Sequence, residues 1–186
     1  VLAVGDCCAK ETEIAVNSIK DPRVRYFNSD KHNGLQDHGS TPKNIGIANS
    51  KGDFIAYLDD DDEYEPNHLE KSLQFFQDHP DVDLVYGCSR VYKFINPLRC
   101  NVRDRDFVKE EHDKSPFINT CEIVHRRSLL DKIEGWRTVG YYNDYDFLKR
   151  ASVVCKIVHS KHIAATQHFP HAHLVHMERR RIERTG

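Results

Sequence analysis

The fold is decided by the stretch "DFIAYLDDDDEYEPNHLE", residues 53–70, in which an apolar run leads straight into four consecutive aspartates. The run at 53–58 predicts a buried strand, and the carboxylates of Asp59 to Asp62 repel one another where this strand ends. Two interpretations are open from these residues alone. The aspartates form either a solvated acidic turn or a site at which carboxylate oxygens hold a hard divalent cation and, through it, a diphosphate.

The surrounding sequence alternates strand-like and helix-like segments. Strands are predicted at 1–4, 24–27, 53–58, 82–94 and 156–160, helices at 12–19, 44–52, 65–80 and 143–153, a strand turning into a helix at 118–136, and connections at 29–43 and 99–114. This alternation predicts an α/β domain with a mostly parallel, twisted sheet flanked by helices. Such sheets bind ligands at the carboxyl ends of their strands, so the position of the aspartates favours the ligand site.

Apolar spacing predicts which side of two helices carries the apolar side chains. These residues are Leu69, Leu73 and Phe76, facing inward in the helix at 65–80, and Ile14, Val16 and Ile19, sharing one side of the helix at 12–19. An apolar stripe at this spacing is typical of a helix that packs on a sheet or on another helix.

Length and composition set the class of protein. The 186 residues suffice for one domain with a real core, and the formal net charge of -2 gives no bulk attraction to nucleic acid, so no nucleic-acid partner is expected. No run of about 18 apolar residues predicts a membrane span. Six cysteines without a C-x-x-C pair favour reduced thiols, which predicts a cytoplasmic protein. The oligomeric state cannot be read from the sequence.

Four segments, in this order, resemble the inverting nucleotide-sugar glycosyltransferases of family 2, which have the GT-A fold. They are "VLAVGDCCAKET" (1–12), "PKNIGIANSKGDFIAYLDDDDEYEPNHLE" (42–70), "INTCEIVHRRSLLDKIEGW" (118–136) and "GYYNDYDFLKRA" (140–151). Spore-coat polysaccharide transferases are similar in how "DPRVRYFNSD" (21–30) leads into the next loop, which implies polysaccharide biosynthesis.

The resemblance also implies how the chain is organised. It implies one GT-A domain over 1–186, with a nucleotide-binding part at about 1–95, an acceptor-binding part at about 96–165 and a tail at 166–186. The family's first strand is absent, and the chain opens at Val1 within an apolar run. We therefore expect a fragment of a longer protein, with that strand preceding Val1.

The resemblance assigns roles to particular residues. It implies that Asp144 is the catalytic base, and that Asp59 and Asp61 are the ends of an Asp-x-Asp (DXD) element that binds Mn²⁺ or Mg²⁺, Asp61 being the first choice as ligand. The residues implied to bind the nucleotide-sugar are Asp6, which reads the base, with Lys43, Asn44, Asp59, Asp60 and Asp61. Asn143 stands where the family usually has Glu beside the base.

Several further residues have both a functional and an ordinary interpretation. Trp136 either stacks on an acceptor sugar or lies in the core, and Arg126 is a candidate for acceptor or phosphate contact. His168 or His171 completes the metal shell or closes over the diphosphate. Otherwise these histidines, with His173 and His176, form a zinc site or lie on the surface. The basic stretch 177–186 contacts an anionic membrane, clamps phosphates, or is a solvated helix end or a linker to a second domain.

These assignments predict a metal-dependent, inverting glycosyltransferase. It moves a sugar from a UDP-, GDP- or TDP-linked donor to a hydroxyl of a saccharide or glycoconjugate, with a carboxylate taking the proton of the attacking hydroxyl. Two alternatives stay open: a non-catalytic domain that binds a nucleotide or sugar, and a sugar nucleotidyltransferase. A nucleotidyltransferase releases pyrophosphate rather than a nucleoside diphosphate.

Overall fold

The computed structural model describes residues 1–34, 37–93 and 100–169 and divides the chain into two compact units. The first unit consists of 1–55 with 126–155, and the second consists of 56–125 with 156–186. The chain passes between the units within strands β3 (Phe54–Ala56) and β7 (Ile123–Arg126), and a third time between residues 155 and 156. Strands and helices alternate in both units, so the predicted α/β class is confirmed.

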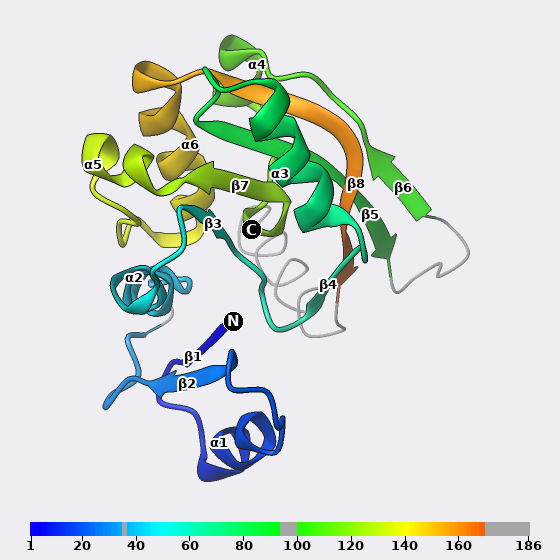
Figure 1. Cartoon of the computed structure of the whole chain (residues 1–186). Coiled ribbons are helices and arrows are strands. Elements are labelled where there is room, and N and C mark those ends of the chain that lie inside the picture. The colour runs from blue at the N-terminus through cyan, green and yellow to red at the C-terminus, as the bar shows by residue number, and fades with distance from the viewer. Residues whose placement is uncertain (35–36, 94–99, 170–186) are drawn as a thin grey trace. The chain divides into compact units, whose positions relative to one another are not determined.

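The first unit holds a small parallel sheet and most of the helices. Its elements are β1 (Leu2–Gly5), α1 (Lys10–Asn17), β2 (Arg25–Asn28), α2 (Ser40–Asn49), η2 (Arg127–Leu129), α5 (Leu130–Ile133), η3 (Gly140–Tyr142) and α6 (Asn143–Val154). β1 and β2 pair in parallel, α2 packs on β1, and α5 contacts α6 (Figure 1). Two aspartates in the first turn of α6 suit the positive end of its dipole.

Helix α2 begins earlier than predicted, because a buried aspartate stabilises its first turn. The carboxylate of Asp37 accepts hydrogen bonds from the backbone N–H of Thr41 at 2.9 Å and from its hydroxyl at 2.8 Å. Gly39 precedes the helix with φ 75°, a left-handed conformation that glycine adopts readily. The prediction of a loop over 29–43 is therefore wrong for its last four residues.

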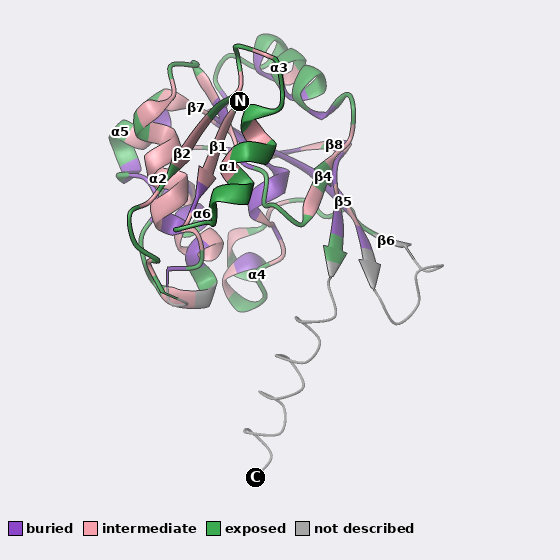
Figure 2. Ribbon diagram, turned by 90° about the horizontal axis from the view of Figure 1, so that it is seen from below, coloured by how far each residue is buried: buried purple, intermediate pink, exposed green. Residues whose placement is uncertain are grey.

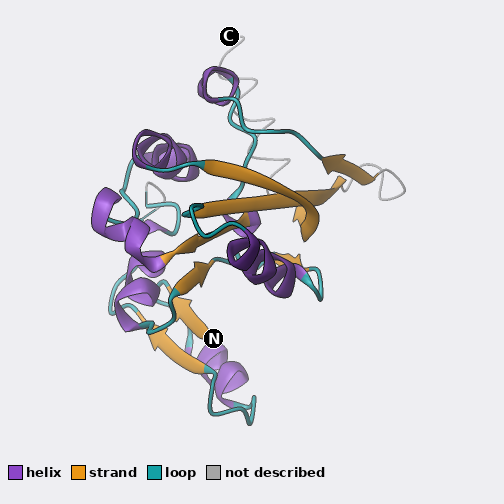
Figure 3. Ribbon diagram, turned by 45° about the horizontal axis from the view of Figure 1, so that its top comes forward, coloured by secondary structure: helices purple, strands orange, loops and turns teal. Residues whose placement is uncertain are grey.

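The second unit is built on a mixed sheet. Its elements are β4 (Asp62–Tyr64), α3 (His68–Asp78), β5 (Leu84–Lys93), β6 (Cys100–Arg103), α4 (Lys109–Lys114), η1 (Thr120–Glu122) and β8 (Ile157–Phe169), with the larger part of β7. The sheet has the order β3-β7-β5-β8-β4, with β6 beside β5. β5 and β8, the long strands of Figure 3, are buried over much of their length (Figure 2).

The strand directions correct the predicted mostly parallel sheet. β5 runs parallel to β8 but antiparallel to β6 and β7, and β4 runs antiparallel to β8. Parallel neighbours need a crossover connection, whereas an antiparallel neighbour can follow a short one. The polar segment 99–114, predicted as a connection, contains β6 and α4.

Helix α3 packs on β5 and β8, and of its three residues predicted to face inward only Phe76 is buried (Figure 1). Its buried residues are His68, Ser72 and Phe76, whereas Leu69 and Leu73 are 45% and 41% exposed. The helix is thus turned by about one residue, because the imidazole of His68 occupies the core. In α1 the predicted helix is present, with Val16 partly buried and Ile14 exposed, and Ile19 lies beyond its end.

A bulge in β8 lies opposite Gly87. Between the pairs Tyr86–His159 and Cys88–Ile163, β5 advances by two residues and β8 by four. Lys161 adopts φ 58° within the bulge, and a Cβ on Gly87 would approach the Ala164 Cβ to 2.7 Å. Bulges redirect side chains, and here two histidines of β8 reach different partners, His159 towards β5 and His162 towards α3.

The buried pair of His68 and His162 makes stability depend on pH. Their ring nitrogens lie 2.9 Å apart, and burial lowers the pKa of both side chains from 6.5 to about 4. Repulsion from His162 lowers the pKa of His68 further, and repulsion from Lys71 and His159 lowers that of His162. Between pH 6.5 and 4 the unfolded chain therefore binds more protons than the folded chain. We expect the free energy of unfolding to decrease as the pH is lowered from 6.5 to 4, by up to about 3 kcal/mol per histidine.

Urea unfolding at several pH values measures this loss. The double variant His68→Phe/His162→Leu is expected to have a flatter pH dependence than the wild type, and His79→Gln, at the exposed end of α3, is the control. Equal slopes for the wild type and the double variant would contradict the assignment of the acid sensitivity to this pair.

Candidate functional site

The acidic run forms a turn of the second unit, as its position after an apolar strand predicts. β3 ends at Ala56, Asp60 and Asp61 form the turn, and Asp62 opens β4. The side chains of Asp59, Asp60 and Asp61 are exposed, and the backbone N–H of Asp62 donates to the carbonyl of Asp59 at 3.3 Å. Several carboxylates are therefore gathered on one short loop.

The fourth aspartate differs from the other three, which the sequence pattern did not predict. Burial raises the pKa of Asp62, and the charges of Asp61 and Asp59 raise it further, against hydrogen bonds from Cys121 and the backbone of His168 that lower it. A divalent cation would relieve the repulsion between these carboxylates, and their oxygens are the ligands that Mg²⁺ and Mn²⁺ prefer. The residues of the turn thus fit such an ion.

His168 lies beside the acidic turn because β8 pairs with β4. Its backbone N–H donates to Asp62 Oδ1 at 3.3 Å, and its Nε2 lies 3.7 Å from Glu63 Oε1. This histidine is separated from the turn by about a hundred residues in sequence, and strand pairing brings it there. His171, His173, His176 and the basic stretch 177–186 lie outside the described residues, so their predicted roles stay predictions.

Asp6 follows β1 in the first unit and is held by the segment after β2. Its Oδ1 accepts hydrogen bonds from the Asn33 side chain at 2.6 Å, from the Asn33 backbone at 3.1 Å and from the Ser29 hydroxyl at 3.1 Å. Burial raises the pKa of Asp6, but these hydrogen bonds and the nearby His32 outweigh it, so the net shift is downward. Asp6 is thus a fixed, ionised hydrogen-bond acceptor at neutral pH.

Asp144 stands in the first turn of α6, also in the first unit. Its Oδ1 accepts the backbone N–H of Tyr145 at 2.7 Å. The preceding Asn143 is buried and donates to the carbonyl of His38 at 2.7 Å and to the hydroxyl of Ser40 at 3.1 Å. Asn143, which replaces a Glu in the resemblance, therefore fixes the start of α6 and positions Asp144.

Asn44 and Trp136 prove to be structural partners. The Asn44 amide accepts the backbone N–H of Trp136 at 3.0 Å and donates to its carbonyl at 2.8 Å. The indole is buried and stacks on Phe147, with ring centroids 4.4 Å apart, as the core interpretation of Trp136 expects. The Lys43 ammonium lies 4.8 Å from the centroid of the indole ring.

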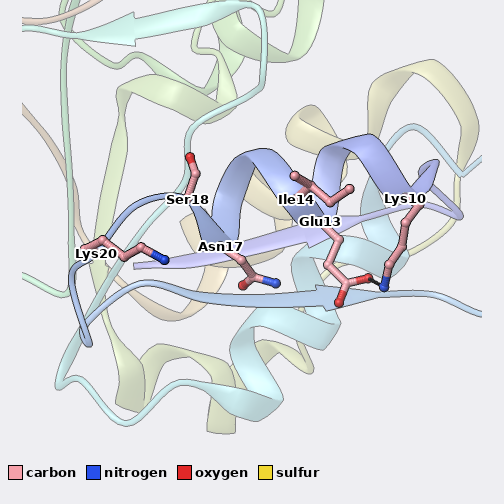
Figure 4. A pocket seen from close by; sticks show the side chains of 6 residues that line it. All are labelled: Lys10, Glu13, Ile14, Asn17, Ser18 and Lys20. Carbon is pink, nitrogen blue, oxygen red and sulfur yellow. Dashed lines mark hydrogen bonds and ion pairs between the residues drawn. The ribbon is translucent and has the colours of Figure 1, made fainter.

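The first unit also contains the candidate residue Arg126 and a shallow hollow. The Arg126 guanidinium lies over the ring of Phe54, 5.2 Å from its centroid. A shallow hollow beside α1 is lined by Lys10, Glu13, Ile14, Asn17, Ser18 and Lys20 (Figure 4). It contains none of the predicted site residues, and its Lys10–Glu13 ion pair is exposed.

The fold is that of the GT-A class, which solved proteins share over about nine tenths of this chain. The family model described as Glycosyl transferase family 2 matches residues 1–134. The chain therefore belongs to Glycosyl transferase family 2, as the resemblance implies.

Individual proteins are similar to this chain in sequence or in fold. Protein CgeD of Bacillus subtilis is 30% identical over 148 residues, which are 73% of this chain and 33% of CgeD. S. aureus TarS 1–349 in complex with UDP-GlcNAc has a TM-score of 0.71 at 14% identity, over 91% of this chain and 50% of TarS. The mannosyltransferase PcManGT from Pyrobaculum calidifontis, in complex with GDP-Man and Mn²⁺, has a TM-score of 0.66 at 18% identity, over 92% and 48%.

The chain is shorter than each of these similar proteins. It spans a third of CgeD and about half of the two solved proteins. Within the described ranges, every helix is too short or too polar to cross a lipid bilayer.

Proposed function

We propose that this chain carries the donor site of a metal-dependent, inverting glycosyltransferase. The observation that carries the proposal is the acidic turn after β3, where Asp59, Asp61 and the half-buried Asp62 crowd together with His168 beside them. Family membership supports a nucleotide-sugar as the ligand of such a turn.

The donor is a sugar linked to UDP, GDP or TDP. Solved proteins of the same fold bind UDP-GlcNAc and GDP-Man. In this chain the ionised carboxylate of Asp6 is suited to accept an N–H of uracil, thymine or guanine, since hydrogen bonds already favour its charged form. Asp59 or Asp60 is assigned to the ribose or to the waters of the metal ion. Lys43 is assigned to phosphate, and this requires its ammonium to leave the indole ring of Trp136.

Asp61 and Asp59 would hold Mn²⁺ or Mg²⁺, with His168 next to them. The ion, when bound, stabilises the negative charge on the departing nucleoside diphosphate. PcManGT, which shares the fold, was solved with Mn²⁺.

Asp144 acts as the general base. Its carboxylate takes the proton of the acceptor hydroxyl while the hydroxyl oxygen bonds to the anomeric carbon and the bond to the diphosphate breaks on the opposite face. Asn143 maintains the position of Asp144 through its bonds to the 38–40 segment. The acceptor is a saccharide or glycoconjugate, and polysaccharide biosynthesis is the process to which we assign the enzyme.

We also propose that the chain has a nucleotide-binding part at about 1–95 and an acceptor-binding part at about 96–165. Arg126 would contact the acceptor, and the basic stretch 177–186 would contact a membrane.

A thermal-shift panel of nucleoside diphosphates with and without Mn²⁺ tests the donor site. A ligand that binds only the folded chain at about 100 times its Kd stabilises it by about 2.7 kcal/mol, which raises Tm by several degrees for a chain of this size. We expect one of the diphosphates of uridine, guanosine or thymidine to give this rise only when Mn²⁺ is present. Nucleoside monophosphates and EDTA are the controls, and equal shifts with and without Mn²⁺ would contradict metal dependence.

A further inference from the structure

A second cluster of metal-ligating side chains lies in the second unit, outside the acidic turn. Cys88 of β5, His159 of β8 and Asp104, which follows β6, offer one ligand atom each, all within 4.8 Å of one another. Cys88 Sγ lies 3.2 Å from His159 Nε2, and both residues are buried. Asp104 is exposed and approaches the pair from the surface, with its Oδ1 3.7 Å from His159 Nδ1.

The imidazole of His159 is held in one orientation. Its ring stacks on Tyr86 with centroids 4.8 Å apart and planes within 9°. Its Nδ1 lies 3.2 Å from Asp106 Oδ1, and Asp106 is in turn bonded to Lys161, at 3.0 Å in the closest approach. A carboxylate at Nδ1 keeps the proton there, so the lone pair of Nε2 points towards the sulfur of Cys88.

The arrangement supports a metal better than a nucleophile. Burial raises the pKa of Cys88 to about 11, with Asp104 adding to the effect, so the thiol is protonated and unreactive at neutral pH without a cation. A bound cation displaces that proton to solvent and takes the thiolate as a ligand. Tetrahedral zinc, with bonds of about 2.3 Å to sulfur and 2.0 Å to nitrogen, places these two atoms about 3.5 Å apart.

We propose that Cys88, His159 and Asp104 form a binding site for a zinc-like transition-metal ion, with Asp106 as the hydrogen-bond partner that orients His159. Thiolate and imidazole ligands select such ions, whereas Mg²⁺ and Mn²⁺ prefer oxygen. The site is thus chemically distinct from the acidic turn, and it does not depend on the proposed transferase activity. The bulge in β8, with Lys161 at φ 58°, supplies both His159 and the lysine that holds Asp106.

Cobalt titration of the reduced full chain tests this site, because a thiolate bound to Co²⁺ gives a charge-transfer band in the near ultraviolet. The background variant is Cys7→Ser/Cys8→Ser, since both of these thiols are exposed. We expect the thiolate band together with the visible bands of four-coordinate Co²⁺, saturation by a single ion, and loss of both on adding Zn²⁺. Absence of the thiolate band would overturn the proposal.

Variants locate the ion. Cys88→Ser is expected to abolish the band, and Cys121→Ser, which removes another buried thiol of the same unit, is expected to keep it. Asp106→Asn, at an exposed residue, should weaken Co²⁺ binding by about 10–100-fold. A thiolate band that survives Cys88→Ser would overturn the proposal. If Cys88→Ser does not fold, an unchanged Co²⁺ affinity of Asp106→Asn would overturn it instead.

Discussion

Replacing Asp144 by asparagine is expected to lower the rate of sugar transfer by about 10²–10⁴-fold while leaving donor affinity unchanged, because an amide of the same shape cannot accept the acceptor's proton. The start of α6 should be preserved, since Asn143 makes the bonds that fix it. Release of nucleoside diphosphate measures the rate, and calorimetry measures donor binding. Asp131→Asn, an exposed acid on α5 of the same unit, is the control for the charge change.

The result separates the proposed enzyme from its alternatives. Unchanged transfer in Asp144→Asn would show that another group is the base. Donor binding in the wild type without any transfer to saccharide acceptors would favour the non-catalytic binding domain. Release of pyrophosphate instead of nucleoside diphosphate would identify a nucleotidyltransferase.

Replacing Asp61 by asparagine is expected to weaken Mn²⁺-dependent binding of the nucleoside diphosphate by about 100-fold or more. Loss of a residue that only hydrogen-bonds to a metal ligand already lowers metal affinity by about 10–100-fold. Without ligand, the same change should leave Tm equal or higher, because it removes one of several mutually repelling charges around Asp62. Calorimetry at saturating Mn²⁺ and thermal unfolding without metal measure the two effects.

The control for this change is Glu70→Gln, an exposed acid on α3 of the same unit. Opposite directions for binding and stability are the signature of a metal ligand. Retained Mn²⁺-dependent binding in Asp61→Asn would show that the acidic turn is a solvated surface feature and would remove the main support for the proposed function.

Elements with an apolar pattern were predictable from the sequence. β1, β2 and α6 lie within a few residues of their predicted places, because apolar runs and helical spacing mark them. β6 was missed because its sequence, "CNVR", is polar and its pairing with β5 is not encoded locally. The buried face of α3 was predicted only at Phe76, because the partner of His68 is His162, 94 residues away.

The candidate site likewise has features that were predictable from the sequence and features that were not. The acidic turn was predictable because it follows a strand directly, and Asp144 because it opens a helix in a recognisable segment. The structural role of Asn44 was not predictable, since the hydrogen bonds of its side-chain amide reach Trp136, 92 residues away. The Cys88–His159 pair likewise depends on the register of β5 and β8, which no periodicity reports.

The first unit is discontinuous in sequence, and this has a consequence for its biosynthesis. Residues 1–55 leave the ribosome well before 126–155, so Asn44 has no Trp136 to bind until the intervening segment has been made. Nascent α2 therefore lacks its contact with Trp136 while most of the other unit is translated. Vectorial folding from the N-terminus, the usual order for separate domains, is not available to this half of the molecule.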